Sequence, residues 1–375
     1  MKTFLLVPDS FKGTLSSGEI CAIMRERILA HEADARVISI PVADGGEGSV
    51  DCFLRAMEGQ RVTCRAVNPF FEEMDGFYGL VNGGRTAVIE MAASAGLPLV
   101  EERKDPLRAT TYGVGLLIRD ALAKGVEEIV LGLGGSATND FGCGAAAALG
   151  ISFYDEDGAV FVPTGGSLSR VARIERGDAM EALRGVRITL MCDVKNPVYG
   201  ATGAAYVYAP QKGADEAQVA LLDEGLRHIS AVAHRDLGVD VSTLAGGGAA
   251  GAMAGGMVAF FGASVRMGID VVLDTVGFDR LLDGADVVFT GEGRLDTQSL
   301  AGKVVVGVAR RAKAKNVPVI AVVGGAEGDD SAIYEQGVHG VFTINRLPQD
   351  LSVSRYKSRE NLSATMDNIL RILKI

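Results

Sequence analysis

The sequence has few of the residues that build cross-linked or metal-bound scaffolds. Its 375 residues include five cysteines and four histidines, and no two cysteines form a C-x-x-C pair. An odd number of cysteines without paired spacing predicts neither a disulfide framework nor a structural zinc site. The histidines are scattered, and the chain contains no G-x-S-x-G motif, so the parts of a serine hydrolase are missing as well.

Positive charge is also scarce. Lys and Arg total 37 against 47 Asp and Glu, which gives a formal net charge of −10. Binding to nucleic acid or to anionic lipid requires a cationic surface that neutralises phosphates. The balance therefore predicts no nucleic-acid partner and no membrane partner, and favours a small-molecule substrate.

Only one stretch is long and uncharged enough to raise the question of a membrane span. Residues 241–265 carry no charge and place Gly247, Gly251 and Gly255 at the spacing of a helix-dimer face. The stretch is mostly glycine and alanine, so we expect a buried glycine loop that leads into a core helix. The N-terminus has one lysine and a short apolar run, which predicts a strand and not a signal peptide. A cytosolic protein is expected.

Glycine is the residue in excess, at 49 of 375, about twice the usual share of ~7%. No collagen-like period or linker absorbs it, so it must lie in many separate turns where the backbone is left-handed or approaches another group closely. The length itself suits two domains.

Short β-type runs alternate with helical patterns, as in α/β proteins with crossover helices. A capping box at Ser16 and Glu19 marks the start of the first helix. Asn82-Gly83-Gly84 predicts an antiparallel hairpin between residues 77–81 and 86–91. Strands are otherwise predicted at residues 3–7, 36–42, 128–133, 187–192, 287–290, 318–323 and 338–344, and helices at 17–30, 47–57, 113–123, 217–233, 303–314 and 360–373.

This alternation predicts two α/β domains. Residues 1–70 plus 275–375 would form a parallel-sheet domain from both chain ends, and residues 71–274 would form an inserted domain. No Pro/Ser-rich linker marks the boundaries.

Five predicted strands end in small residues beside carboxylates. In open parallel sheets, ligands gather at the carboxyl ends of strands. Glycine there lets backbone N–H groups converge on an anion, and a neighbouring carboxylate tolerates phosphate when a divalent cation lies between them. The set therefore predicts a magnesium nucleotide and phosphoryl transfer, in which positioning and charge neutralisation supply most of the catalysis. The loops are residues 9–14, 44–48, 132–140, 193–197 and 291–296.

Two other interpretations stay open at this point. Each Gly/Asp pair can be an ordinary turn, because these residues dominate turns for local reasons. In addition, Gly132-x-Gly134-x-x-Ala137 with Asp155 fits the dinucleotide fingerprint, which would make the protein an NAD(P)-dependent oxidoreductase. A non-enzymatic nucleotide sensor built on the same loops is a third possibility.

The motif set resembles the bacterial type-1 glycerate kinase family, in order and from residue 1 to about 372. The matching motifs are Pro8-Asp9-Ser10-Phe11-Lys12-Gly13, Ala43-Asp44-Gly45-Gly46-Glu47-Gly48, Gly132-Leu133-Gly134-Gly135-Ser136-Ala137-Thr138-Asn139-Asp140, Asp193-Val194 with Asn196-Pro197, and Thr290-Gly291-Glu292-Gly293-Arg294-Leu295-Asp296 with Gly302-Lys303. The resemblance implies ATP- and magnesium-dependent phosphorylation of D-glycerate, usually at the 2-hydroxyl. It also implies a flavodoxin-like domain made from both chain ends and an inserted α/β domain with a mixed sheet.

We hypothesise a role for each motif residue, in a site between the two domains. Backbone N–H groups and hydroxyls of the 132–140 loop would hold the ATP phosphates, through Gly132, Gly134, Gly135, Ser136 and Thr138. Candidate magnesium ligands are Asp44, Glu47 and Glu292. Asp193 is the first candidate for the base that accepts the glycerate proton and Asp296 the second.

Cations are needed for the carboxylate of the substrate. Arg294 is preferred for that role, because Arg grips a carboxylate with two parallel hydrogen bonds. Lys12 would assist catalysis by binding either carboxylate or phosphate. Ser10 and Asn196 complete the predicted substrate contacts. No oligomeric state follows from the residues.

Overall fold

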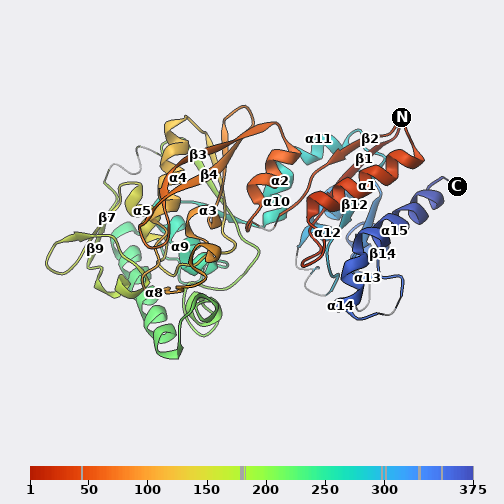
Figure 1. The fold of residues 1–375 in the computed structure, drawn as a ribbon. Helices are drawn as coiled ribbons and strands as arrows, with labels where there is room; N and C mark the ends of the chain where they lie inside the picture. The colour runs from red at the N-terminus through yellow and green to blue at the C-terminus, as the bar shows by residue number, and fades with distance from the viewer. Residues whose placement is uncertain are drawn as a thin grey trace. The chain divides into compact units, whose positions relative to one another are not determined.

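The computed structural model describes residues 1–43, 45–177, 181, 183–296, 299, 302–327, 331–347 and 349–374. The chain forms two compact units, each with its own sheet and core (Figure 1). Unit 1 consists of Met1–Ala43, Asp51–Met57 and Ile269–Ile375, and unit 2 of Asp44–Val50 and Glu58–Gly268. Both chain ends thus lie in unit 1.

Unit 1 contains a five-stranded parallel sheet. Its strand order is β2-β1-β12-β13-β14, and every neighbouring pair is parallel. Numbered within the unit, this is the order 2-1-3-4-5 of flavodoxin-like folds, whose ligand site lies where the order reverses, between the first and third strands. The strands are β1 (Thr3–Pro8), β2 (Arg36–Ser39), β12 (Val287–Gly291), β13 (Val319–Val323) and β14 (Val338–Thr343).

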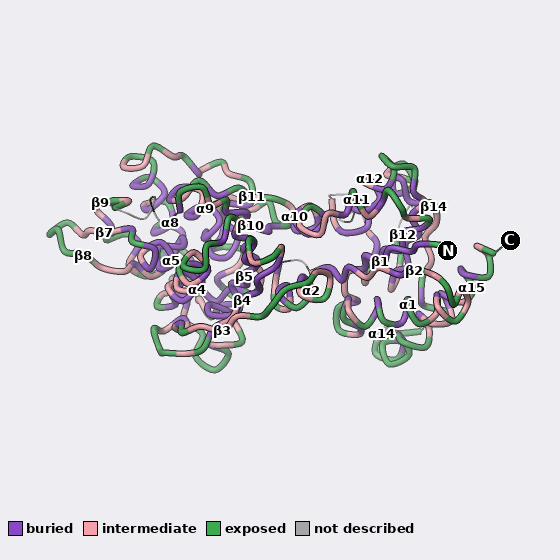
Figure 2. Tube along the Cα trace, turned by 90° about the horizontal axis from the view of Figure 1, so that it is seen from above, coloured by how far each residue is buried: buried purple, intermediate pink, exposed green. Residues whose placement is uncertain are grey.

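The three inner strands of this sheet, β1, β12 and β13, are buried along their whole length, as expected when helices cover both faces (Figure 2). The capping box predicted at Ser16 and Glu19 is present at the start of α1. The helices of unit 1 are α1 (Ser17–His31), α11 (Phe278–Leu282), α12 (Val304–Ala314), α13 (Ser331–Glu335), α14 (Leu351–Ser354) and α15 (Ser358–Ile372); α2 (Ser49–Ala56) and α10 (Gly268–Thr275) extend into it from residues of unit 2.

Unit 2 contains a six-stranded mixed sheet in the order β11-β10-β6-β5-β4-β3. The first four strands are parallel, and β4 and β3 are antiparallel additions at one edge. The predicted hairpin is the β4–β5 pair. The strands are β3 (Gly59–Val67), β4 (Glu73–Val81), β5 (Thr86–Glu90), β6 (Glu128–Gly132), β10 (Arg187–Met191) and β11 (Ser264–Arg266); β7 (Ser152–Tyr154), β8 (Val160–Phe161) and β9 (Arg173–Glu175) form a separate small sheet.

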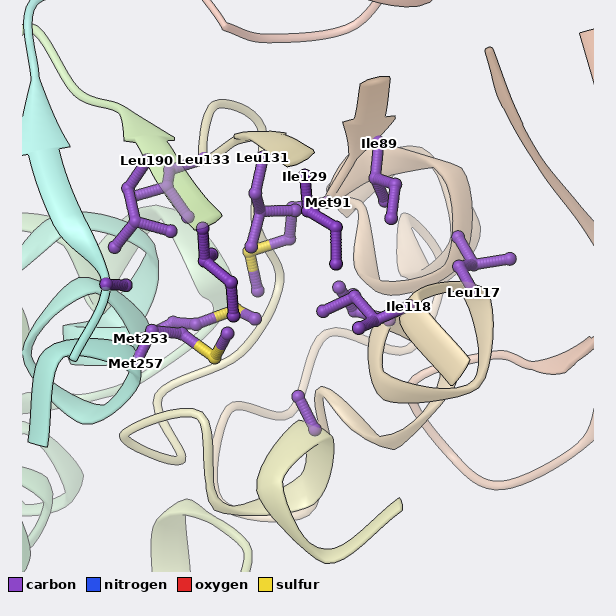
Figure 3. Packing of buried hydrophobic residues seen from close by; sticks show 14 of the residues in the cluster. Ile89, Met91, Leu117, Ile118, Ile129, Leu131, Leu133, Leu190, Met253 and Met257 are labelled. Atoms are coloured by element: carbon purple, nitrogen blue, oxygen red, sulfur yellow. The ribbon is translucent and has the colours of Figure 1, made fainter. Parts of the chain in front are cut away.

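One core of unit 2 lies between the large sheet and its helices. Figure 3 shows Leu131 of β6 and Leu190 of β10 above Met253 and Met257 of α9. The helical segments are α3 (Ala92–Ala95), η1 (Leu97–Val100), α4 (Tyr112–Ala123), α5 (Cys143–Ala148), η2 (Gly165–Arg170), α7 (Ala204–Tyr208), η3 (Pro210–Lys212), α8 (Glu216–Leu237) and α9 (Ala249–Phe261).

The uncharged stretch 241–265 is a glycine loop followed by the buried helix α9, as the sequence predicts. Ala250, Gly251 and Ala252, near its start, have left-handed backbone angles, with φ of 56°, 64° and 66°. Alanine is disfavoured in that region by roughly 1–2 kcal/mol per residue, so tertiary packing must impose this turn. Among the described residues, no helix has the length and hydropathy needed to cross a bilayer.

The fold class predicted from the sequence is confirmed: one parallel sheet is built from both chain ends and one mixed sheet from the middle. Strand β3 is missing from the strands predicted from the sequence. Most β3 residues are exposed or half-buried. Residues 61–66 nevertheless alternate polar with apolar side chains, which is a strand pattern, and Val62, Cys64 and Ala66 pack in or against the core of unit 2. Pairing with β4 along nine residues makes it a strand.

The core contact of β6 generates a stability prediction. Leu131 is fully buried, whereas Leu221 on α8 is 48% exposed. Leu131→Ala should lower the free energy of unfolding of unit 2 by about 2–5 kcal/mol, because it leaves a cavity. Leu221→Ala, the same chemical change, should alter it by less than about 0.5 kcal/mol. Urea denaturation followed by circular dichroism checks both values, and equal effects would contradict the packing described.

Candidate active site

Two of the predicted glycine loops pack backbone against backbone in unit 2. The N–H of Gly134 donates to the carbonyl of Gly45 at 2.9 Å. A Cβ at Gly132 would lie 2.4 Å from the Gly45 oxygen, and a Cβ at Gly134 would lie 2.6 Å from the Gly46 Cα. Real Cβ atoms do not approach this closely, so only glycine permits the contact.

The loop that follows β6 presents donors to its surroundings. Gly135 is exposed, with a φ of 74°, and Ser136 next to it is only 6% exposed. Within the described part of the chain, the backbone N–H groups of Gly135, Ser136 and Thr138 donate to no acceptor. Unpaired N–H groups close together in one loop are the kind of donors that bind an anion.

The dinucleotide interpretation fits this loop poorly. The fingerprint requires a helix that opens within the glycine motif. Here the next helix, α5, begins at Cys143. Asp155, the proposed ribose ligand, lies in the turn between β7 and β8 and accepts a hydrogen bond from the N–H of Ala159.

A buried lysine holds the same loop from the inside. Lys212, at the end of η3, is 2% exposed. Its Nζ donates to the Ser136 hydroxyl at 2.8 Å and to the Thr138 carbonyl at 2.7 Å. Burial lowers the pKa of Lys212 to about 7, and the charge of Asp140 opposes that shift. Sequence reasoning misses Lys212, because no motif surrounds it.

Asp140 is a structural centre beneath the loop. Its side chain accepts hydrogen bonds from the Thr111 N–H at 2.7 Å and the Thr111 hydroxyl at 2.8 Å, and also from the N–H groups of Gly142 and Gly144. Burial raises the pKa of Asp140, while these donors lower it. The carboxylate therefore stabilises the turn into α5.

Glu90, at the end of β5, anchors the loop that carries Glu47. It is 1% exposed and accepts hydrogen bonds from the N–H groups of Gly48 at 3.1 Å and Val50 at 2.6 Å. Glu47 itself is exposed, and Asp44 lies outside the described residues. An acidic residue at the end of an otherwise apolar strand is the signal that could have identified Glu90.

The loop after β10 begins beside the loop after β6, because Met191 and Gly132 are paired neighbours in the sheet. Asp193 is exposed, and its Oδ1 accepts a hydrogen bond from the N–H of Gly268 at 2.7 Å. The Asn196 amide donates to the carbonyl of Thr202 and accepts a hydrogen bond from the Tyr208 hydroxyl.

In unit 1, the loops after β1 and β12 meet where the strand order reverses. The N–H of Asp9 donates to the carbonyl of Gly291 at 2.8 Å. A Cβ at Gly293 would lie 3.4 Å from the backbone nitrogen of Lys12. Ser10 is half-buried, Lys12 is exposed, and residues 10–16 line a surface hollow.

Glu292 is the most perturbed acid of this switch point. It is 5% exposed, and its Oε1 has no hydrogen-bond partner among the described residues. Burial raises the pKa of Glu292 to about 7. A hydrogen bond from Ser299 and the charge of Lys303 oppose the shift, and the nearby Asp9 and Asp296 add to it.

The two remaining candidates of this loop are less buried. Arg294 is 66% exposed at its side chain and forms an ion pair with Glu327. Asp296 is half-buried, and its Oδ1 accepts a hydrogen bond from the N–H of Ser299.

The predicted site residues therefore fall into two groups, one in each unit. Unit 1 gathers five of them at its switch point, and unit 2 gathers the others at the carboxyl ends of β6 and β10 or in the loop tied to β5. The unit 1 group is Ser10, Lys12, Glu292, Arg294 and Asp296; the described unit 2 group is Glu47, Gly132, Gly134, Gly135, Ser136, Thr138, Asp193 and Asn196.

The environment of Lys212 generates a prediction on pH. The folded protein releases this proton near pH 7, whereas an unfolded lysine keeps it until about pH 10.4. Between these values the unfolded state binds more protons, so the free energy of unfolding rises with pH, by at most about 1.4 kcal/mol per unit. Lys212→Met should lack this rise. Urea denaturation of both proteins between pH 7 and 9 tests it, and a constant difference between them would contradict the prediction.

Comparisons with known proteins agree with this architecture. The model of the glycerate kinase family matches residues 4–374. The chain is 41% identical to a glycerate kinase of Bacillus cereus over 372 residues, covering 99% of this chain and 98% of the relative. It is 37% identical to the glycerate 2-kinase of Escherichia coli over 372 residues, and this match also covers 99% of this chain and 98% of the relative.

A crystal structure assigned to glycerate kinase 2 of Salmonella typhimurium LT2 matches with a TM-score of 0.88 and 39% identity. The match covers 100% of this chain and 98% of the other. The resemblance noted in the motifs thus extends over the whole fold, and the chain belongs to the glycerate kinase family.

Proposed function

We propose that the protein transfers the γ-phosphoryl group of ATP to the 2-hydroxyl of D-glycerate, giving 2-phosphoglycerate and ADP. Family membership over the whole chain supports glycerate as the acceptor. The relative from Escherichia coli, named a glycerate 2-kinase, supports the 2-hydroxyl.

The observation that carries the proposal is the loop after β6. Its N–H groups at Gly135, Ser136 and Thr138 are unpaired among the described residues, and the contacts of Gly132 and Gly134 with Gly45 and Gly46 fix the start of the loop. Such donors compensate the negative charge of phosphoryl oxygens, which is the main requirement of phosphoryl transfer. The Ser136 hydroxyl adds a donor beside them.

The residues present fit a magnesium ion shared with phosphate. Magnesium in such sites usually takes one or two carboxylates and completes its shell with phosphate and water. Glu292 offers a buried oxygen without a partner, and Glu47 and Asp44 are further candidates. No cluster of three or more His, Cys, Asp or Glu occurs among the described residues. We propose that phosphate oxygens and water complete the shell of the ion. The ion would neutralise charge on the transferring phosphoryl group.

Asp193 is our candidate for the base that accepts the proton of the glycerate hydroxyl, with Asp296 as the second candidate. Asp193 is exposed at a strand end, where a substrate can reach it. The hydrogen bond from the N–H of Gly268 orients its carboxylate. A positioned base contributes about 10²–10⁴-fold to such reactions.

Arg294 and Lys12 are the proposed partners of the substrate carboxylate. Both are exposed at the switch point of unit 1, on an acidic chain where cations are scarce. Arg294 pairs with Glu327, so a bound carboxylate would replace that side chain as the partner of the guanidinium. Ser10 and Asn196 are proposed to contact the substrate as well, although the Asn196 amide already bonds Thr202 and Tyr208.

A coupled assay with Mg-ATP and a panel of hydroxy acids tests the proposed reaction. We expect ADP release that depends on D-glycerate, and phosphorus NMR should identify 2-phosphoglycerate as the product. A product phosphorylated at the 3-hydroxyl would overturn the regiochemistry alone. Reduction of a nicotinamide cofactor would support the oxidoreductase, and nucleotide binding without turnover would support the sensor.

The role of Asp193 is tested with Asp193→Asn, which keeps an oxygen for the Gly268 N–H but removes the base. We expect turnover to fall by about 10²-fold or more with ATP binding intact. Asp240→Asn is the matched control, because Asp240 also accepts a hydrogen bond from a backbone N–H, that of Ser242, and belongs to none of the candidate loops. A fall of less than tenfold in Asp193→Asn would mean that Asp193 is not the base.

A further inference from the structure

We infer that Lys212 is a positioning residue that sets the loop after β6 in the conformation that binds nucleotide. The inference rests on the proposed function, since it concerns the loop that we assign to the ATP phosphates. Lys212 touches no substrate in this proposal. It acts through two groups of the loop, the Ser136 hydroxyl and the Thr138 carbonyl.

The backbone around Lys212 is itself held in place. The Lys212 N–H donates to the carbonyl of Ala209. Gly213 follows with a φ of 101°, and a Cβ there would lie 2.8 Å from the Cβ of Lys104. The lysine therefore leaves a tight turn at a defined point, and its side chain crosses a buried region to reach the loop.

The hydrogen bond to Ser136 determines what that hydroxyl can do. A serine hydroxyl has one proton and can also accept. When Lys212 is protonated it has no acceptor capacity, so Ser136 then accepts from it and the serine proton is left for another acceptor. Beside the unpaired N–H groups of Gly135 and Ser136, that proton adds a further donor for a phosphate oxygen.

The bond to Thr138 fixes the direction of one peptide group of the loop. Its carbonyl accepts from Lys212 at 2.7 Å. Gly251 packs against the other side, where a Cβ would lie 2.0 Å from the same oxygen. Gly251 belongs to the left-handed turn 250–252, so a strained backbone and a buried lysine both serve to place this carbonyl.

A purely structural role explains the lysine less well. Burying an amine costs free energy through desolvation, and an apolar side chain of similar length, such as methionine, would fill the same space without that cost. What lysine adds is hydrogen-bond donors and, when it is protonated, positive charge beneath the loop. Thr138 Oγ1 and the Asn139 amide are buried without partners among the described residues, so the side chains of these two residues do not hold this part of the loop by hydrogen bonds of their own.

Binding of MgADP, measured by calorimetry, and steady-state kinetics test the inference. Lys212→Met should weaken MgADP binding and raise the KM for ATP at least tenfold, while the KM for D-glycerate changes less than about twofold. Lys212→Gln keeps a donor without the charge and should lie between the two proteins. Ser136→Ala should reproduce part of the loss.

A destabilised control separates positioning from general loss of structure. Leu226→Ala removes a fully buried side chain of α8 in another part of unit 2 and should lower stability without changing the KM for ATP. Equal weakening of nucleotide binding in Leu226→Ala, or wild-type binding in both Lys212→Met and Lys212→Gln, would overturn the inference alone. A wild-type protein that binds no MgADP would overturn the proposed function and this inference together.

Discussion

Close approach of two backbones is the constraint on which the unit 2 site depends. Gly132 and Gly134 leave the end of β6 with Gly45 and Gly46 directly against them, at distances that exclude any side chain. This contact brings the short segment of residues 45–50 onto the sheet, although the rest of the N-terminal region belongs to unit 1. Glu90 then ties the same segment through the N–H groups of Gly48 and Val50. At these two loops, glycine is thus a packing requirement.

The buried charged groups of the two units differ in how they are hydrogen-bonded. Beneath the β6 loop, a buried acid and a buried amine are each satisfied by several hydrogen bonds, and they stabilise backbone conformations that carry the donors. At the switch point of unit 1, Glu292 is buried with an oxygen that no described group satisfies, and its pKa rises accordingly. A hydrogen-bonded buried acid or amine suits a scaffold, whereas an unsatisfied buried carboxylate suits a site that gains a cation.

The placement of the candidates supports the phosphate-loop interpretation more than the dinucleotide one. In a dinucleotide fold, one glycine motif leads straight into a helix. Here the motif leads into a loop in which the N–H groups of Gly135, Ser136 and Thr138 are unpaired among the described residues, and the helix begins only at Cys143. The reversed strand order between β1 and β12 marks a second ligand position by topology alone, and five predicted residues lie there.

The sequence by itself determined the α/β class, the capped first helix, the hairpin, the glycine-rich strand ends and the family, because these depend on local periodicity, turn chemistry and contiguous motifs. Only the tertiary structure decided that β3 joins the second sheet, that Arg294 pairs with Glu327, that the Asn196 amide is engaged by its own loop, and that Lys212 and Glu90 support the candidate site. Those contacts join residues far apart in the chain through burial and hydrogen bonding. A lysine or glutamate carries no sign in the linear sequence of whether it will be buried, because burial is a property of the packed elements around it.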